Sequence, residues 1–312
     1  LTARFRYTMS RILNLGSLNL DYVYRMERIV SPGETLASTA FSCGAGGKGL
    51  NQSVALARAG AEVCHAGCLG READWLRELL GTERVDTARL RAVDQPAGHA
   101  IIQVDAAGRN AIVLHGGANL ALQPDRLPGL FEGFGPGDWF LTQNETSCVP
   151  EALAAARARG LTVCFNPAPM HASVARYPLT AVDWLVVNEH EGAELGGGTA
   201  PADILRGLRK LCPRATLILT LGAAGAWGAP PEGEPVFVTA PKVTAVDTTA
   251  AGDTFIGYLL AASMQGATLL VALELACRAG AMCVTRPGAS ASIPHRDELQ
   301  PVLCRQPATL TP

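Results

Sequence analysis

The chain has 312 residues, of which 48% are hydrophobic, 17% charged and 5% aromatic, and its net charge is −2. This charge and the scarcity of aromatic residues argue against nucleic-acid binding. The chain contains no run of about 18 uncharged apolar residues, so no membrane span is predicted. The length fits two domains or one large α/β domain. The nine cysteines include no CxxC pair, which favours free thiols in a reducing, cytoplasmic compartment.

Short apolar runs alternate with helical patterns along most of the chain. Such alternation predicts a mainly parallel sheet covered by helices. The predicted strands are Ile12–Leu15, Val63–Gly67, Trp139–Thr142, Thr162–Phe165, Trp184–Val187 and Thr216–Thr220. The predicted helices are Asn51–Ala59, Trp75–Leu80, Pro150–Arg159, Ala202–Leu211, Asp253–Met264 and Leu269–Val284.

Two stretches break the alternation. Residues 21–43 contain strand-like residues and no helical pattern, and His99–Val104 with Asn110–His115 predict a hairpin. Together they predict a small β appendage near the N-terminal end of the sheet. At the two ends of the chain, we expect residues 1–8 to be an extension and residues 305–312 a flexible tail.

A glycine-rich segment at residues 44–51 surrounds Lys48 and leads into a helical pattern. Glycines let a ligand approach the backbone, and the following helix would present free N–H groups to it, so the segment favours a polar ligand. A dinucleotide loop would directly follow the first strand, but about 40 residues precede this one. A P-loop would have Ser or Thr where Gly49 stands. A turn that merely packs the helix is the remaining alternative.

Three further segments combine polar or small residues with the end of a strand or the start of a helix. In residues 247–255, Ala250, Ala251 and Gly252 precede Asp253 at a helix start, which favours bound phosphate, although Asp253 as a plain helix cap is the alternative. Residues 188–191 follow a strand, where open sheets bind ligands, or they form a capped helix start. Residues 220–225 contain two glycines after an apolar run, and this turn could contact a nucleotide or be a simple hairpin turn.

In this order and spacing, the segments resemble the ribokinase-like (PfkB) family of carbohydrate kinases, from Ile12 to Arg296, and look closest to its ribokinases. The most specific motifs are Gly46-Gly47-Lys48-Gly49-x-Asn51-Gln52 and Asp247-Thr248-x-Ala250-Ala251-Gly252-Asp253-Thr254-Phe255. The resemblance implies a three-layer α/β/α fold, with a mainly parallel central sheet and a small β-sheet lid. It also implies one kinase domain over residues 9–304, with the lid formed by about residues 22–40 and 98–115.

The resemblance implies transfer of the γ-phosphate of ATP to a sugar hydroxyl, with D-ribose as the expected acceptor and ribose 5-phosphate as the product. In the family, the residue matching Asp253 is the catalytic base, and backbone amides matching Ala250, Ala251 and Gly252 form an anion hole. The sugar-binding positions are matched by Asn19, Asp21, Gly47, Lys48, Gly49, Asn51 and Glu145, together with Asp253.

The resemblance also implies nucleotide and cation sites. Asn188 and Glu191 match positions associated with the phosphates and hydrated Mg²⁺. The nucleotide would further contact Gly252, Cys277 and the turn Thr220, Leu221, Gly222, Ala223, Ala224 and Gly225. A monovalent cation, K⁺, would bind the Asp247 side chain and mostly carbonyl oxygens of Thr249, Cys283, Arg286, Gly288 and Ser292. In relatives the lid often pairs with a second lid, which implies a homodimer.

Other functions remain open on the sequence. The acceptor could be fructose, a deoxy sugar acid or a nucleoside, and a nucleoside base would stack on Tyr22 or Tyr24. A sugar phosphate would need extra cations such as Arg25 and Arg28. A non-catalytic sugar or nucleotide sensor is the alternative outside the enzymes, although it need not keep Asp253. Leu50 stands where the family has a small residue, so it either crowds the sugar pocket or faces the core.

Overall fold

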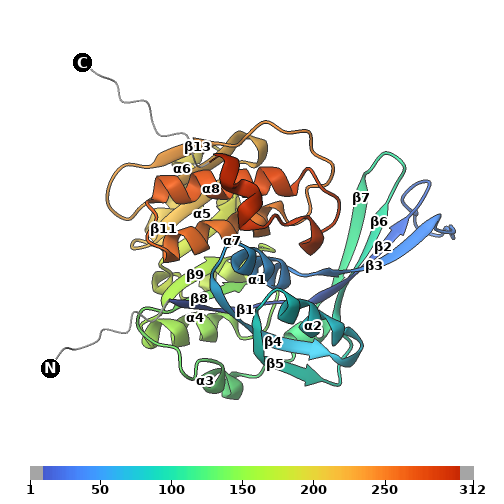
Figure 1. Ribbon diagram of the computed structural model, residues 1–312, viewed down its shortest axis with the longest axis horizontal. Coiled ribbons are helices and arrows are strands. Elements are labelled where there is room, and N and C mark those ends of the chain that lie inside the picture. Colours follow the sequence, from blue (N-terminus) through green and yellow to red (C-terminus); the bar gives the residue numbers. More distant parts are fainter. Residues whose placement is uncertain (1–9, 303–312) are drawn as a thin grey trace.

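The computed structural model describes residues 10–302 (Figure 1), so the expected extension at 1–8 and tail at 305–312 lie outside the described residues. Within this range the central sheet has nine strands in the order β13-β12-β11-β10-β9-β8-β1-β4-β5. All its neighbouring pairs from β11 to β5 are parallel, and β12 and β13 add an antiparallel edge. The strands are β1 (Arg11–Leu15), β4 (Glu62–Gly70), β5 (Asp86–Val93), β8 (Trp139–Gln143), β9 (Thr162–Asn166), β10 (Trp184–Asn188), β11 (Thr216–Thr220), β12 (Gly225–Ala229) and β13 (Val236–Thr239).

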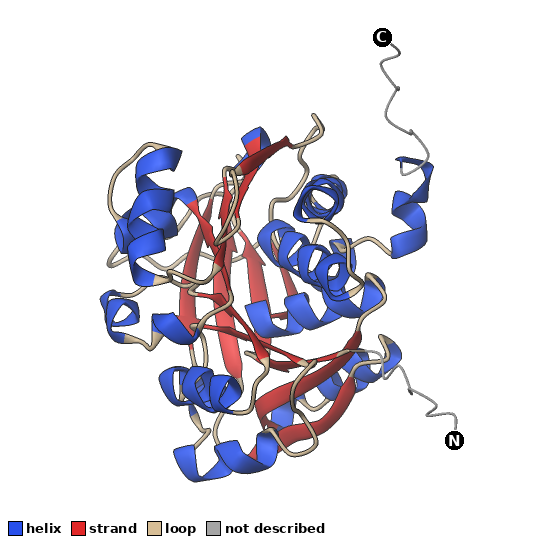
Figure 2. Cartoon of the chain, turned by 90° about the vertical axis from the view of Figure 1, so that its left-hand side faces the viewer, coloured by secondary structure: helices blue, strands red, loops and turns tan. Residues whose placement is uncertain are grey.

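Helices cover both faces of this sheet (Figure 2). One buried apolar cluster joins one face of the sheet to helices α1, α2, α7 and α8, and a second cluster joins the other face to α3, α4, α5 and α6. The expected three-layer α/β/α fold is therefore confirmed. The helices are α1 (Lys48–Arg58), α2 (Trp75–Thr82), α3 (Leu127–Leu130), α4 (Val149–Ala158), α5 (Glu189–Gly196), α6 (Pro201–Leu211), α7 (Ala251–Met264) and α8 (Leu269–Cys283).

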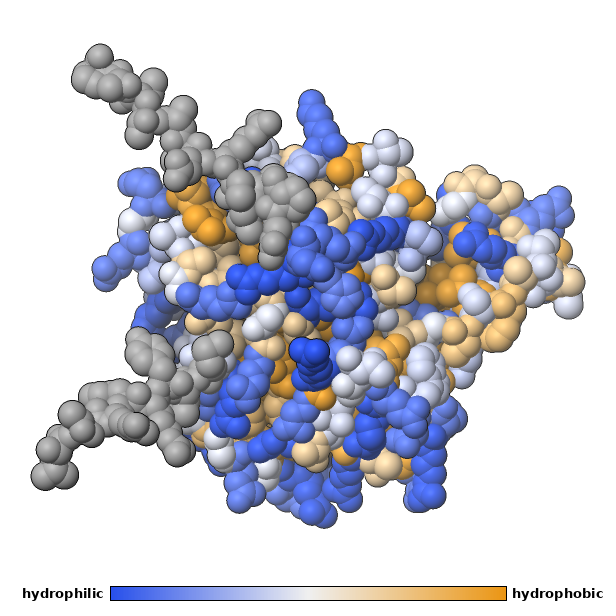
Figure 3. Space-filling view, viewed as in Figure 1, coloured by the Kyte–Doolittle hydropathy of each residue, from blue (hydrophilic) through white to orange (hydrophobic). Residues whose placement is uncertain are grey.

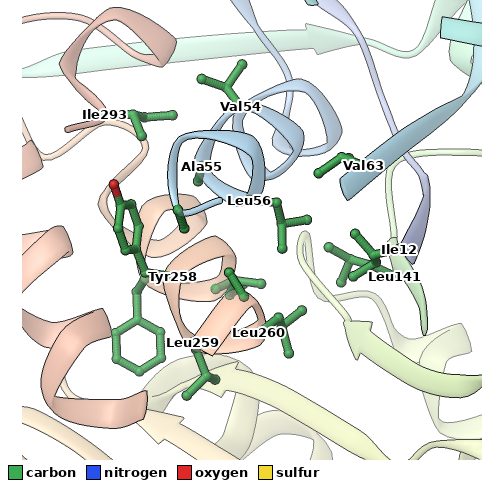
Figure 4. Close-up of a cluster of buried hydrophobic side chains, with 14 of the residues drawn as sticks. Ile12, Val54, Ala55, Leu56, Val63, Leu141, Tyr258, Leu259, Leu260 and Ile293 are labelled. Carbon is green, nitrogen blue, oxygen red and sulfur yellow. The ribbon is translucent and has the colours of Figure 1, made fainter. Parts of the chain in front are cut away.

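Helices α1 and α7 pack closely against each other in the core (Figure 4). A Cβ atom added at Gly257 of α7 would lie 2.3 Å from the Cβ of Ala55 in α1, so only glycine permits this approach. Most of α7 is buried, from Asp253 to Ala262, as expected for a helix with apolar residues around its circumference. This contact brings the first turns of α1 and α7 together.

A second sheet of four strands, in the order β3-β2-β6-β7, projects from the body (Figure 1). Its strands are β2 (Asn19–Arg25), β3 (Ala40–Gly46), β6 (Gly98–Val104) and β7 (Asn110–His115). The predicted hairpin is confirmed, whereas the strands of the first lid segment begin earlier and end later than the expected range 22–40. Strand β2 pairs in parallel with β6 and antiparallel with β3.

All six predicted central strands are present, but the sequence did not predict β5, β12 or β13. β5 is an edge strand with several polar residues, β12 consists mostly of glycine and alanine, and β13 is short. Helices α3 and α5 were also not among the predicted helices. In the part of the chain that the structure describes, no helix is both long enough and apolar enough to cross a membrane.

Candidate active site

The glycine-rich segment is not a single loop. Gly46 ends β3, Gly47 caps α1 with a φ of 93°, and Lys48 is the first residue of α1, so the predicted helix start at Asn51 was wrong by three residues. A Cβ atom at Gly46 would lie 2.1 Å from the carboxylate of Asp21, and positive φ favours glycine at residue 47. The glycines therefore let the lid strand pass the Asp21 side chain and turn directly into a helix.

Asp253 lies in the first turn of α7 and does not cap this helix. The cap is Ala250, with a φ of 59°, and α7 begins at Ala251. The carboxylate of Asp253 instead accepts hydrogen bonds from Asn51 Nδ2 at 3.1 Å and Gln52 Nε2 at 2.9 Å, both in α1. The capping interpretation was therefore wrong, because α1–α7 packing directs this carboxylate across to α1.

A cavity of about 210 Å³ lies at the start of α7. Lys48 from α1, Asn188 and Glu191 from the end of β10 and start of α5, and Asp253 all line it. Ala250, Ala251 and Gly252 also contribute to its wall. The first N–H groups of a helix have no partner within the helix, so this wall suits an anion.

Lys48 carries its positive charge into this cavity. Burial alone would lower the pKa of its ammonium group, but the carboxylates of Asp253, Glu145 and Glu191 outweigh burial and raise it. The ammonium group therefore stays charged beside the start of α7. A fixed cation opposite a helix N-terminus is an arrangement that binds phosphoryl groups.

Asn188 and Glu191 form a capping box at the start of α5. Asn188 Oδ1 accepts from the Glu191 backbone N–H at 2.9 Å, and Glu191 Oε2 accepts from the Asn188 backbone N–H at 2.9 Å. The capped-helix interpretation is therefore confirmed. Both residues also line the 210 Å³ cavity, which is compatible with a role near the phosphates. That role stays a prediction.

A larger cavity of about 750 Å³ adjoins the smaller one and shares Asn188, Thr220 and Gly252 with it. The turn between antiparallel β11 and β12 contributes to its wall, so this segment is a hairpin turn and lines a cavity. Of the predicted nucleotide contacts, Gly222, Ala223, Gly225 and Cys277 line it, whereas Leu221 and Ala224 are not among its lining residues. Leu221 packs instead against the second core cluster. The lining residues that were not predicted include Lys242 and Val243, which lie outside the motifs, and Phe255, which ends one of them.

Two of the predicted sugar-binding positions lie at a third cavity, of about 160 Å³, at the base of the lid. Asn19 and Glu145 line it, together with Asn119 and Asn144, which were not predicted as site residues. Asn19 Oδ1 accepts a hydrogen bond from Asn119 Nδ2 at 2.7 Å. Gly47 and Gly49 do not line this cavity; they shape the backbone at the start of α1.

Glu145 connects the sugar-binding positions to α1. It accepts hydrogen bonds from the hydroxyl of Ser17 and from the Lys48 backbone N–H, the latter at 3.1 Å. Burial raises the pKa of Glu145, against the opposing effect of Lys48. Ser17 lies in the segment after β1, and no sequence pattern singled out its contact with a residue 128 positions away.

Asp21 is held in an environment that disfavours its charge. Burial, followed by the negative charge of Glu145, raises the pKa of Asp21 from 3.8 to about 6. The folded protein therefore binds a proton here more tightly than the unfolded chain, and keeping Asp21 ionised above pH 6 weakens the fold.

Replacing Asp21 by Asn is expected to stabilise the protein by about 1–3 kcal/mol at about pH 7.5, because the neutral amide removes the cost of a buried charge. The gain should shrink towards about pH 4.5, where Asp21 is protonated in the folded protein. Urea unfolding at both pH values measures it. A gain of the same size at both values, or none at neutral pH, would contradict this electrostatic interpretation.

The predicted cation positions also lie together. Asp247 Oδ1 accepts from Thr249 N at 2.9 Å, and Asp247 Oδ2 accepts from Gly288 N at 2.9 Å. Burial opposes ionisation of Asp247, but these hydrogen bonds outweigh it and lower its pKa. The thiol of Cys283 contacts Ser292 Oγ at 3.1 Å. The guanidinium of Arg286 is itself a cation and pairs with Glu298 at 2.5 Å, so only the backbone carbonyl of Arg286 could serve as a cation ligand.

The geometry also bears on the alternatives. Tyr22 packs against Phe41 and His99, and since successive residues of a strand face opposite ways, it points away from the face that carries Asp21. This position argues against stacking of a nucleoside base beside the sugar. Arg28 forms an ion pair with Glu34 at 2.5 Å, so it is engaged rather than free for a sugar phosphate. Leu50 is fully buried in the first core cluster and therefore faces the core.

Comparisons with known proteins identify the family. Residues 9–296 match the model of the pfkB family carbohydrate kinases. A curated ribokinase of Schizosaccharomyces pombe is 36% identical over 304 residues, which is 92% of this chain and 95% of the relative.

Two solved structures are similar over most of both chains. The crystal structure of ribokinase from Cryptococcus neoformans var. grubii in complex with ADP has a TM-score of 0.82 and 35% identity, covering 94% of this chain and 99% of that one. The structure of Arabidopsis thaliana ribokinase complexed with ribose and ATP has a TM-score of 0.84 and 28% identity, covering 95% of this chain and 99% of that one. This chain therefore belongs to the PfkB family of carbohydrate kinases, enzymes that transfer a phosphoryl group to an alcohol.

Proposed function

We propose that this protein is an ATP-dependent kinase that transfers the γ-phosphoryl group of ATP to D-ribose and forms ribose 5-phosphate. The observation that carries the proposal is the position of Asp253: its carboxylate lies in the first turn of α7, in the wall of a cavity that also contains Lys48. Ribokinases at up to 36% identity support ribose as the acceptor.

In the proposed mechanism, Asp253 accepts the proton of the sugar hydroxyl as its oxygen attacks the γ-phosphorus. The backbone N–H groups of Ala250, Ala251 and Gly252 and the ammonium group of Lys48 stabilise the charge that develops on the phosphoryl oxygens. The bond from the γ-phosphorus to the bridging oxygen breaks, and ADP leaves towards the 750 Å³ cavity. The proton remains on Asp253 until the product departs.

The sugar would be held opposite this carboxylate by the residues at the base of the lid. Asn51 Oδ1 is a buried oxygen that has no hydrogen-bond partner among residues 10–302, so a donor from the ligand would satisfy it. Sugar hydroxyls are such donors. Asp21, Asn19 and Glu145 would provide further acceptors. An analogue that lacks a hydroxyl would leave one of these buried acceptors unpaired and would therefore bind more weakly.

Two cations belong to the proposal. Asn188 and Glu191 would hold hydrated Mg²⁺, which would supply positive charge at the phosphates. Their side-chain oxygens suit this ion, because Mg²⁺ binds few protein oxygens and keeps most of its waters. K⁺ would bind the carboxylate of Asp247 and the nearby carbonyl oxygens, a set of hard oxygen donors that suits this ion. K⁺ there would order the segment before α7 without touching the sugar.

Release of ADP with ATP, Mg²⁺ and a panel of acceptors, with and without K⁺, tests the proposal. We expect ribose to give the highest kcat/KM among ribose, fructose, a deoxy sugar acid and adenosine, and K⁺ to raise turnover. A higher value for another acceptor would replace ribose in the proposal. Were none of them to accelerate ADP release, a sugar or nucleotide sensor would become the better description.

We also propose a homodimer formed through the lid. The projecting sheet exposes apolar side chains (Figure 3), among them Phe41 at 55%, Ile112 at 56% and Val113 at 64% exposure. Exposed apolar residues on a sheet are a typical interface between subunits. The face that carries Asp21 also carries Ile112 and the exposed Leu114, whereas Phe41 and Val113 lie on the opposite face. A second lid on the Asp21 face would therefore cover both the sugar and the side chains of Ile112 and Leu114.

Ile112→Asp is therefore expected to convert the dimer into a monomer in sedimentation equilibrium, because a charge in an apolar interface is costly. Val113→Asp is the matched control, since its side chain points to the opposite face of the same strand. It should remain dimeric. A wild-type protein that sediments as a monomer, or a control that dissociates equally, would contradict the proposed interface.

The free thiols favour a reducing compartment, and we propose the cytoplasm. All eight cysteines described are unpaired, and six of them, including Cys164 and Cys283, are buried. Buried thiols behave as small apolar residues and are typical of reducing surroundings. Fractionation of cells that express the protein tests this location, and recovery outside the cytoplasm would exclude it.

A further inference from the structure

Beneath Asp253 lies a connected group of buried polar side chains. Asn14, Gln52, Ser53 and His65 are fully buried, and Gln143 is 1% exposed. They come from β1, α1, β4 and β8. Polar groups so far from water are costly unless they bond to one another, so their arrangement is expected to be specific.

Gln52 is the member that touches Asp253. Its Nε2 donates to Asp253 Oδ1 at 2.9 Å and to Asn166 Oδ1 at 3.2 Å. Its Oε1 accepts from Gln143 Nε2 at 2.7 Å, and that same nitrogen donates to Asn14 Oδ1 at 3.0 Å. Both protons of the Gln52 amide therefore point to acceptor oxygens, one of which belongs to Asp253.

The network continues to a histidine. Asn14 Nδ2 donates to Ser53 Oγ at 2.8 Å, and Ser53 Oγ lies 2.8 Å from His65 Nδ1. His65 Nε2 lies 3.2 Å from the carbonyl oxygen of Gly16, which can only accept, so the ring proton is on Nε2. Burial lowers the pKa of His65 to about 4, so the ring is neutral near pH 7.

With the proton on Nε2, each hydrogen bond of the network has one possible donor and one possible acceptor. His65 Nδ1 is an acceptor, so the hydroxyl of Ser53 donates to it and accepts from Asn14. The oxygen of Asn14 then faces the Gln143 nitrogen, and the oxygen of Gln52 faces that nitrogen as well. Rotating the Gln52 amide by 180° would place its oxygen against two acceptors and its nitrogen against a donor. That rotation would leave several buried groups unpaired, whereas in the observed arrangement the one oxygen of these five side chains without a partner among residues 10–302 is Gln143 Oε1.

We propose that Gln52 is a positioning residue for Asp253, and that the network of Gln143, Asn14, Ser53 and His65 holds the Gln52 amide nitrogen towards the carboxylate. The inference rests on the proposed role of Asp253 as the base. Gln52 binds one carboxylate oxygen and Asn51 the other, so the plane of the carboxylate is held towards the 210 Å³ cavity. Misplacing a reacting group by about 1 Å can cost about 100-fold in rate.

Gln52→Met keeps the length of the side chain and removes its amide. We expect kcat to fall about 10- to 100-fold while KM for ribose and for ATP changes less than about threefold, because Gln52 acts on the base and not on either substrate. Thr142→Val is the matched control: it removes the buried hydrogen bonds from Thr142 Oγ1 to the Leu15 carbonyl at 2.9 Å and to the Gln143 backbone carbonyl at 3.4 Å, but no side-chain amide of the network. Its Tm should fall, but its kcat should stay within about twofold of the wild-type value.

Gln143→Met tests whether the network acts through Gln52. It leaves Gln52 in place but removes the donor to its oxygen, so kcat should fall less than in Gln52→Met. The double variant should then have the kcat of Gln52→Met alone, since residues that act through one another are not additive. Losses that multiply, or a wild-type kcat in Gln52→Met, would overturn the inference. Should Gln52→Met fail to fold, Gln143→Met tests the inference by itself. A wild-type kcat in Gln143→Met would then overturn it.

The Asp253→Asn variant separates this inference from the proposed function. If Asp253→Asn turns over near the wild-type rate, Asp253 is not the base and both proposals fail. If Asp253→Asn is inactive while Gln52→Met keeps a wild-type kcat, only the positioning role fails. Loss of kcat in both variants, with KM retained in Gln52→Met, supports both.

Discussion

Asp253→Asn is expected to lower kcat by at least about a thousandfold, because an amide cannot accept the proton of the attacking hydroxyl. Affinity for ribose and ATP should change little, since the side chain keeps its size and its position in α7. Steady-state release of ADP gives kcat, and calorimetric titration with each substrate gives the affinities.

This substitution also turns one oxygen into a donor that faces the amide nitrogen of Asn51 or Gln52. A stability loss of about 1–3 kcal/mol is therefore expected and must be separated from the loss of rate. Asp138→Asn is the matched control, because each oxygen of Asp138 also accepts one N–H group, here from the backbone of Arg11 and of Gly135, and Asp138 lines none of the three cavities. If this control lost as much kcat as Asp253→Asn, a general effect on the fold would explain both.

Gly49→Ala is expected to destabilise the protein by about 3 kcal/mol or more and to lower kcat/KM with it. A Cβ atom at Gly49 would lie 2.3 Å from Ser17 N and 2.4 Å from Gly16 Cα, and backbone atoms cannot move aside as a flexible side chain can. The start of α1 would have to shift, carrying Lys48 and Asn51 away from the carboxylate of Asp253.

Gly81→Ala is the matched control for Gly49→Ala, because Gly81 also lies in a helix but has no atom within 4 Å of an added Cβ. There alanine should leave stability unchanged or raise it by about 0.5–1 kcal/mol, from its higher helix propensity. Urea unfolding of both variants measures the difference. Equal stabilities would show that the close approach at Gly49 relaxes without cost and would remove the argument for a rigid α1 start.

The central strands and most helices could be predicted because their signals are local. Val186 and its neighbours in β10 form a short apolar run followed by polar residues, and such runs are typical of buried parallel strands. By contrast, Gly225–Ala229 has few side chains that report burial, and it becomes a strand only because β11 and β13 supply hydrogen-bond partners. This pairing depends on residues distant in sequence, so the local pattern of apolar and polar residues does not predict it.

Much of the candidate site could also be predicted, since Lys48, Asn51 and Asp253 lie in two short motifs. Their surroundings could not. The bond from Gln52 to Asp253 joins residues 201 positions apart, and the bond from Ser17 to Glu145 spans 128 positions. Neither Gln52 nor Ser17 belongs to a residue class that signals chemistry by itself.

The amino-acid sequence alone determined the order of most strands and helices, the two glycine-containing motifs and the resemblance to sugar kinases, because each depends on neighbouring residues. Only the tertiary structure decided which amides meet the Asp253 carboxylate and how they are oriented. The physical reason is that close packing of α1 on α7, through Ala55 and Gly257, sets the register between two helices distant in sequence. Hydrogen bonds then form only between groups that this register brings within reach.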